Sequence, residues 1–230
     1  MQILYEDNHL IAVNKAPGEI VQGDKTGDKP LSDILKDYIK VKYDKPGEVF
    51  LGVPHRLDRP TSGVVLFART SKALVRLNEM FKDHEAIKKT YWAIVQGQPQ
   101  QPEARLEHYL TRNEAQNKSY VVGNQKSDVR NQTEAKLAIL NYRTLAHGDH
   151  YTLLEVELLT GRHHQIRCQL AAIGCPIKGD LKYGARRSNP DGSICLHARE
   201  ITFIHPVRRE PLTITAPVPP DSLFEKMSKQ

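Results

Sequence analysis

The sequence predicts an α+β fold built around a mainly antiparallel sheet. Short apolar segments of strand length outnumber the amphipathic segments of helix length, and the two kinds do not alternate regularly along the chain. A chain of 230 residues, 39% hydrophobic and 26% charged, has an ordinary globular composition and can bury a substantial core. Its longest apolar runs are far shorter than a membrane-spanning helix requires.

Hydrophobic spacing places the elements of the first half of the chain. Two apolar segments around an Asp-Asn turn predict a hairpin, and Ser32 and Ser71 stand where a serine hydroxyl can cap a helix. The remaining strands are apolar runs bounded by glycine or proline. The predicted elements are strands over 3–5 and 10–13, a helix over 32–43, a strand over 64–67, a helix that begins at 71 and includes 81, and a strand over 91–95.

The second half of the chain is richer in strands. One helix is expected where a Gly-Arg turn follows a strand, and Gly174 and Pro176 end it. A polar loop is expected over residues 113–130. The predicted elements are strands over 106–110, 137–142 and 151–159, a helix over 163–172, and closing strands over 201–204 and 212–215.

The net charge of +6 is concentrated in two stretches of the chain. Residues 51–92 contain eight Lys or Arg and four Asp or Glu, and residues 161–210 contain nine and four. The two stretches therefore carry +4 and +5, against −3 for the remainder. Separate basic stretches are typical of a protein that binds a polyanion such as nucleic acid. The alternative is a lysine-rich surface with no such partner.

Cysteine usage and the first residues indicate the compartment. Cys168, Cys175 and Cys195 are an odd number without a Cys-x-x-Cys pair, which argues against a disulfide framework and a zinc ribbon. The beginning of the chain lacks the basic and apolar pattern of a signal peptide. We therefore expect a protein of the reducing cytoplasm.

The segment His55–Gly63 reads His-Arg-Leu-Asp-Arg-Pro-Thr-Ser-Gly, with Asp58 between two arginines in a turn before a buried strand. Flanking cations favour the charged form of a carboxylate, which suits a nucleophile better than a general acid. The alternative is a turn aspartate that binds backbone amides and pairs with a neighbouring arginine.

A second segment, residues 88–97, places two lysines at the entrance of a strand that carries Tyr91. A tyrosine ring that stacks on a base beside phosphate-binding lysines is a nucleotide platform. The alternative is a core tyrosine on a half-buried strand.

The third segment is Gly161–Arg167, where a strand ends and a helix begins, so that its polar residues can point into a cleft. Arg167 follows His163 by four residues, and a helix would aim both the same way. Histidines 164, 197 and 205 raise a metal site as a rival, but the segment has no His-Glu-x-x-His pattern and no cysteine pair.

Together the three segments resemble the signature motifs of RluA-type pseudouridine synthases, which isomerise uridine to pseudouridine in ribosomal or transfer RNA. The resemblance extends from about Leu4 to Pro217. It rests on residues 55–63, on Lys89, Tyr91, Ala93, Val95 and Gly97, on residues 161–167, on the tail 174–180 with Tyr183, and on residues 196–198 and 205–206.

This resemblance implies the pseudouridine synthase fold, in which a mixed, mostly antiparallel sheet is bent into two lobes around a central catalytic cleft. Residues 1–230 would then form a single catalytic domain, without the N-terminal S4-like domain of many members. The reaction breaks the N-glycosidic bond of a uridine, rotates the uracil and rejoins it through carbon. No cofactor and no metal are implied.

The resemblance also implies the roles of individual residues. Asp58 would be the catalytic residue, which attacks the sugar, attacks the base or removes a sugar proton. Tyr91 would lie against the target base, and Arg167 would form a salt bridge with the aspartate. The RNA contacts are expected from the other polar residues of the motifs, namely Arg56, Arg59, Lys89, Arg162, His164 and Gln165.

Three rivals come from other classes. A catalytically inactive RNA-binding protein of the same fold would not need Asp58. A glycoside hydrolase needs two carboxylates, and Asp180 would have to be the second. A metal-dependent nuclease would lose its activity to a chelator. The expected partner is ribosomal or transfer RNA, bound by a monomer with no protein partner and no membrane.

Overall fold

The computed structural model describes residues 1–83, 85–122 and 134–229. The chain divides into two compact units. The first contains Met1–Lys88 and Ala198–Pro217, and the second contains Lys89–His197 and the residues from Val218 onward.

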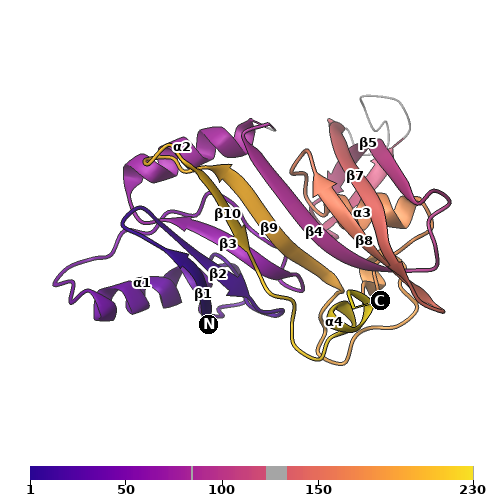
Figure 1. Cartoon of the computed structure of the whole chain (residues 1–230), viewed down its shortest axis with the longest axis horizontal. Coiled ribbons are helices and arrows are strands. Elements are labelled where there is room, and N and C mark those ends of the chain that lie inside the picture. Colours follow the sequence, from indigo (N-terminus) through magenta and orange to yellow (C-terminus); the bar gives the residue numbers. More distant parts are fainter. Residues whose placement is uncertain (84, 123–133, 230) are drawn as a thin grey trace. The chain divides into compact units, whose positions relative to one another are not determined.

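The first unit is built on hydrogen-bonded strands in the order β1-β2-β3-β9, with β10 also paired to β9 (Figure 1). The β1–β2, β2–β3 and β9–β10 pairs are antiparallel. Its elements are β1 (Gln2–Glu6), β2 (Leu10–Lys15), α1 (Leu31–Lys42), β3 (Ser62–Ala68), α2 (Ser71–Lys82), β9 (Leu196–Ile204) and β10 (Pro211–Thr215); the first two residues of β9 belong to the other unit.

Helix α1 covers one face of these strands. Leu35 and Ile39 of the helix pack on Val13 of β2 and on Val65 and Phe67 of β3. Strands β2 and β3 are almost entirely buried, as their uninterrupted apolar sequences predict. The unit therefore offers a rigid base from which β3 and the loop before it are positioned.

The second unit contains an antiparallel sheet with the strand order β4-β8-β7-β5-β6. Its elements are β4 (Ile87–Gln96), β5 (Glu103–Asn113), β6 (Lys118–Val122), β7 (Lys136–His147), β8 (Tyr151–Leu158), α3 (Gln165–Ala172), the short 3-10 helix η1 (Leu181–Tyr183) and α4 (Leu223–Met227). The first two residues of β4 belong to the other unit.

Helices α3 and α4 cover opposite faces of the second sheet. Ile166 and Leu170 of α3 pack in a core with Ala93 and Leu154, whereas Phe224 and Met227 of α4 pack with Ile94 and Leu153. Neighbouring residues of a strand point to opposite faces, so the pairs 93/94 and 153/154 separate the two cores.

The predicted α+β class and the antiparallel pairing are confirmed, and each predicted strand is present, several with longer bounds. The predicted helix starts are wrong by one or two residues. Pro30 and Thr70, not the serines that follow them, are the N-cap residues of α1 and α2, and the Thr70 side chain accepts a hydrogen bond from the Ala73 amide.

Helix α3 begins at Gln165 rather than at residue 163, because His164 has a left-handed backbone with φ of 52° that interrupts the helix. The polar loop predicted over 113–130 is correct at residues 114–117, which form a turn, but wrong at residues 118–122, which form β6 and pair with β5. The remainder of that segment, 123–130, lies outside the described residues.

Within the described ranges, no helix has the length and apolar character needed to cross a membrane. The longest helices, α1 and α2, have 12 residues each.

Candidate active site

The loop that carries Asp58 is held by a buried cation. Lys15, at the end of β2, is only 1% exposed, and its ammonium group donates hydrogen bonds to three backbone carbonyls. The acceptors are Ala16 at 3.0 Å, Arg59 at 3.0 Å and Thr61 at 2.6 Å. Burial lowers the pKa of Lys15 to about 8, while the negative charges of Glu19 and Asp58 oppose this shift. Two of the three acceptors, Arg59 and Thr61, follow Asp58 in the chain, so the lysine fixes the backbone on the C-terminal side of Asp58.

The rest of the loop is fixed at both ends. The imidazole of His55 accepts a hydrogen bond from the Leu66 amide of β3 at 2.9 Å and stacks on Phe81 with ring centroids 4.6 Å apart. Gly63 has a φ of 115°, and a Cβ there would lie 2.3 Å from the Ala198 carbonyl oxygen. Only glycine fits at this position, because any side chain would displace the strand beside it.

The side chains of this loop have different surroundings. Asp58 is half-buried, and its carbonyl accepts the Thr61 amide at 3.0 Å in a tight turn. Arg59 is exposed and pairs with Asp28 at 2.5 Å. Arg56 is exposed as well. The two arginines that flank the aspartate in sequence are therefore available at the surface of the first unit.

Tyr91 and Lys89 lie on β4 in the second unit. Tyr91 is half-buried at the margin of the α3 core, opposite Val156 of β8. Lys89 is also partly buried, and burial lowers the pKa of its ammonium group. Its Nζ atom lies 4.0 Å from the point where a Cβ on Gly161 would be, so the second and third sequence motifs meet here.

Gln165 braces the turn that leads into α3. Its Oε1 accepts hydrogen bonds from the Thr160 hydroxyl at 2.7 Å and from the Arg162 amide at 3.0 Å, and its Nε2 donates to the Ile139 carbonyl at 3.0 Å. The residue is 3% exposed. The Arg162 side chain lies over β7, with Nε 3.0 Å from the Leu137 carbonyl. These contacts favour a bracing role for Gln165.

Arg167 forms a two-pronged ion pair with Asp180. Its Nε donates to Oδ2 at 2.6 Å and its Nη2 to Oδ1 at 2.9 Å. The side chains are 6% and 1% exposed, so the pair is buried. The ring of Tyr183 lies 5.1 Å from the guanidinium carbon.

Two histidines before α3 link this pair to β6. The Tyr183 hydroxyl accepts the Ser119 amide at 2.9 Å and lies 3.0 Å from Nδ1 of His164. His163 stacks on His164 and lies 2.9 Å from the Ser119 hydroxyl. Burial, and after it the positive charge of Arg167, lowers the pKa of His164 to about 2. His164 is therefore a neutral group hydrogen-bonded to the Tyr183 hydroxyl, rather than a cation for RNA phosphate.

Contrary to what their spacing predicts, His163 and Arg167 do not lie on one face of a helix, because α3 begins at Gln165. His163 precedes the helix and contacts Ser119 and Asn117 of the β5–β6 hairpin, whereas Arg167 reaches Asp180. The left-handed residue between them, His164, is the physical reason.

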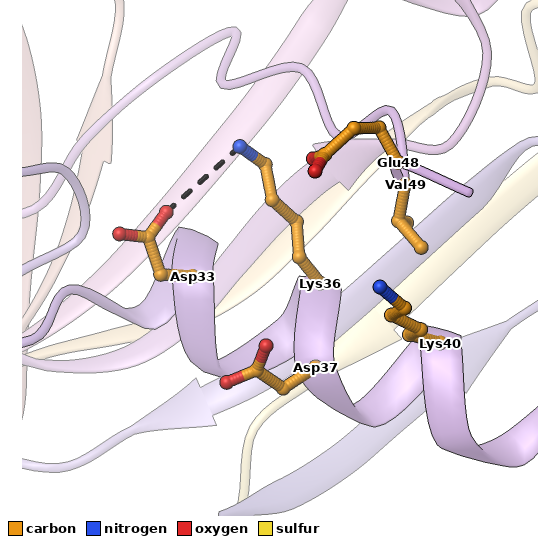
Figure 2. A pocket seen from close by; sticks show the side chains of 6 residues that line it. All are labelled: Asp33, Lys36, Asp37, Lys40, Glu48 and Val49. Carbon is orange, nitrogen blue, oxygen red and sulfur yellow. Dashed lines mark ion pairs between the residues drawn. The ribbon is translucent and has the colours of Figure 1, made fainter. Parts of the chain in front are cut away.

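Figure 2 shows a surface depression on the first unit that contains none of the predicted site residues. An ion pair joins Lys36 to Asp33 at 3.9 Å across one part of it. Its lining has three acidic and two basic residues, which does not suit a polyanion. The lining residues are Asp33, Lys36, Asp37, Lys40, Glu48 and Val49.

In the part of the chain that the structure describes, no three His, Cys, Asp or Glu side chains are grouped so as to hold a metal ion. The histidines considered for such a site have other contacts. His205 pairs with Asp7 at 3.0 Å, His197 lies against Phe224, and His164 contacts Tyr183.

Comparison with known proteins identifies the family. Residues 9–172 match the family described as RNA pseudouridylate synthase. The chain is 33% identical to tRNA pseudouridine synthase C of Vibrio cholerae, over 94% of this chain and 90% of that protein. It is 31% identical to ribosomal large subunit pseudouridine synthase D of Zymomonas mobilis, over 96% of this chain and 70% of that protein. The chain belongs to the RNA pseudouridylate synthase family.

The fold agrees with this assignment. The structure of human RNA pseudouridylate synthase domain containing 4 superposes with a TM-score of 0.78, at 24% identity, over 95% of this chain and 89% of the human chain. This pseudouridine synthase isomerises uridine in RNA, and nothing in the comparisons supports the inactive alternative.

The sequence did not predict the contacts of several residues that surround the motif residues of this pseudouridine synthase. Lys15 could have been noticed as a lysine directly after the apolar strand Leu10–Val13, where a buried cation needs partners. Asp180 and Tyr183 follow Arg167 by 13 and 16 residues, a separation with no local geometric meaning. No single-sequence signal indicated the partnership of Ser119 with His163.

Proposed function

We propose that this pseudouridine synthase modifies uridines of transfer or ribosomal RNA and that Asp58 is its catalytic residue. The observation that carries the proposal is the Asp58 loop: a half-buried carboxylate on a backbone fixed by Lys15 and by the turn to Thr61. Reacting groups act best on backbone that does not need to reorganise. The RNA classes are those named for the relatives from Vibrio cholerae and Zymomonas mobilis.

Tyr91 and Arg167 complete the proposed catalytic set. Tyr91 packs against the core of the second unit and is only half-buried, which suits a ring that lies against a base. A target base must leave its stack to be rotated, and an aromatic platform offsets part of that cost. Arg167 is proposed to supply positive charge for the reacting carboxylate, as the resemblance implies.

The phosphate contacts are assigned to the accessible cations of the three motifs. Arg56 and Arg59 are exposed, and Arg162 and Lys89 are partly so. Gln165 and His164 are buried and engaged within the second unit, so their role in RNA binding is indirect: they shape the turn that presents Arg162.

Release of tritium tests the function directly. When C5 of uridine becomes bonded to C1′, the hydrogen on C5 leaves to solvent, so RNA labelled with tritium at C5 loses its label. Transfer RNA and ribosomal RNA transcribed without modifications should be compared as substrates, with and without EDTA. Release by wild type and its loss in Asp58→Asn supports the proposal, and EDTA should have no effect. No release from either RNA would contradict it, and EDTA sensitivity would indicate metal-dependent chemistry.

We also propose that the protein acts in the cytoplasm as a monomer. In the described residues the two motif-bearing units both come from one chain, so the proposed catalytic set needs no second copy. Sedimentation equilibrium at enzyme concentrations that give full activity should return the mass of one chain, 26.1 kDa. A dimer mass would contradict the monomer.

A further inference from the structure

The Arg167–Asp180 pair has the geometry of a fixed support rather than of a flexible ion pair. Two parallel hydrogen bonds, 2.6 and 2.9 Å long, join one edge of the guanidinium to both carboxylate oxygens. Such a two-pronged contact fixes the plane of the guanidinium as well as its position. At 6% and 1% exposure, neither side chain can exchange its partner for bulk water.

The backbone around Asp180 is itself fixed to the strand that carries Tyr91. Next to it, the Lys178 amide donates to the Ile94 carbonyl of β4 at 2.9 Å. Gly179 has a φ of 91°, and a Cβ there would lie 2.6 Å from the Ser193 carbonyl oxygen, so only glycine allows this approach. After it, the Asp180 carbonyl accepts the amides of Tyr183 and Ala185 at 3.1 and 3.0 Å.

A ring closes the face of the same guanidinium. The Tyr183 ring centroid lies 5.1 Å from the Arg167 carbon, within the range of a cation–π contact. The hydroxyl of this ring is held by the Ser119 amide and by His164. A carboxylate in the guanidinium plane and an aromatic ring against its face leave Arg167 a single orientation.

We propose that Asp180 is a positioning residue of the isomerisation, acting through Arg167. A guanidinium has five N–H groups. Asp180 receives two of them along one edge. Asp180 thus fixes the direction in which Arg167 presents its positive charge and neutralises that charge before RNA binds. This inference rests on the proposed catalytic role of Arg167.

A merely structural ion pair makes a different prediction from a positioning pair. If Asp180 only stabilises the fold, its substitution lowers the fraction of folded enzyme and leaves the rate of the folded enzyme unchanged. If it positions Arg167, its substitution has no further effect on the rate once the guanidinium has been removed. Residues that act through each other are non-additive in this way.

A double-mutant cycle separates these cases. Single-turnover tritium release at saturating enzyme and the Kd for RNA would be measured for wild type, Asp180→Asn, Arg167→Ala and the double variant, with thermal unfolding to give the folded fraction. We expect Asp180→Asn to lower the rate about 10- to 100-fold with little change in Kd, as misplacement of a reacting group does. In the Arg167→Ala background the same substitution should change the rate by less than about threefold.

Glu155→Gln is the matched control, because it removes the exposed pair with Arg143 on β7 and β8 of the same unit. Its rate should equal that of wild type. An equal loss from Asp180→Asn in both backgrounds, or a loss that matches the folded fraction, would overturn the proposal. If the Asn variant does not fold, Asp180→Glu keeps the charge on a longer side chain, and the same two rates decide. An inactive wild type or a fully active Arg167→Ala variant would instead overturn the proposed function on which the inference rests.

Discussion

The loop around Asp58 and the region around Arg167 are held in opposite ways. In the first, a buried side chain, Lys15, holds backbone carbonyls, while the side chain of interest is only half-buried. In the second, the side chain of interest is itself held, by the Asp180 carboxylate and the Tyr183 ring. Another side chain therefore holds the backbone of the Asp58 loop, whereas Arg167 is part of its own support.

This difference determines what substitutions do. Where the backbone is the held group, the support can be changed without touching the reacting atom. Where the side chain is held, activity and stability change together, because each partner of a buried ion pair leaves an unpaired charge when the other is removed. The following predictions test that distinction, from the largest expected effect to the smallest.

Substitution of Asp58 by asparagine should give the largest loss of activity. The variant keeps the shape and the carbonyl that accepts the Thr61 amide, and it removes only the charge. We expect the tritium-release rate to fall about a thousandfold or more, as removal of an essential reacting group does. RNA affinity and the unfolding temperature should stay close to those of wild type. Turnover within tenfold of wild type would show that Asp58 is not the catalytic residue.

Substitution of Lys15 by methionine should lower stability rather than remove a reacting group. Methionine fills a similar volume but leaves the Arg59 and Thr61 carbonyls without their donor in a buried place. The free energy of unfolding should fall by about 2–4 kcal/mol, the sum expected for such unsatisfied groups. Urea unfolding followed by circular dichroism measures it.

The control for Lys15 is Lys40→Met on the exposed face of α1, which should be within about 0.5 kcal/mol of wild type. The tritium-release rate of the folded Lys15→Met variant, measured at low temperature, completes the test. A variant as stable as wild type would show that the loop does not depend on the buried ammonium.

Two substitutions of Tyr91 should separate the contribution of its ring from that of its hydroxyl. Tyr91→Phe keeps the stacking face, so RNA affinity should be unchanged, whereas Tyr91→Ala should weaken binding by about 1–3 kcal/mol, the contribution of one stacked base. Filter binding with unmodified substrate RNA measures both. If the two variants lose activity equally, the hydroxyl takes part in the chemistry and a stacking role alone is wrong.

The two regions also differ in how far the sequence alone predicts them. Asp58, Tyr91 and Arg167 were proposed because their segments resemble the motifs of a known family, and the strands were predicted because apolar runs report burial directly. The contacts that support these residues were not predicted. Asp180 and Ser119 act over long sequence separations, and the hairpin of β5 and β6 has a polar sequence that resembles a loop.

The predicted starts of α1 and α2 were wrong for a local reason. A serine signals a cap, yet Pro30, two residues before Ser32, and Thr70, one residue before Ser71, have extended backbones and begin the helices instead. At α3 the start depends on the left-handed backbone of His164, and the contacts that hold this residue come from Tyr183, 19 residues away. Local propensity could not have predicted it, since tertiary contacts decide the conformation.

His164 also gives the most specific test of the region around Arg167, with the smallest expected effect. His164 is buried beside Arg167, and its pKa falls from an ordinary value of 6.5 to about 2. Between these values the unfolded chain binds a proton that the folded chain does not. The free energy of unfolding should therefore decrease as the pH falls below about 6.5, by at most about 1.4 kcal/mol per pH unit from this group.

Asparagine is the informative substitution at this position. It adopts the left-handed backbone readily and can still form a hydrogen bond with the Tyr183 hydroxyl, but it does not titrate. From pH 7 to pH 5, wild type should lose about 2 kcal/mol more stability than His164→Asn in urea unfolding. His150→Asn, on an exposed residue of the same unit, should follow wild type. Parallel pH curves for wild type and His164→Asn would mean that the imidazole is protonated in the folded protein, and the support around Arg167 would then be a cluster of cations rather than a neutral network.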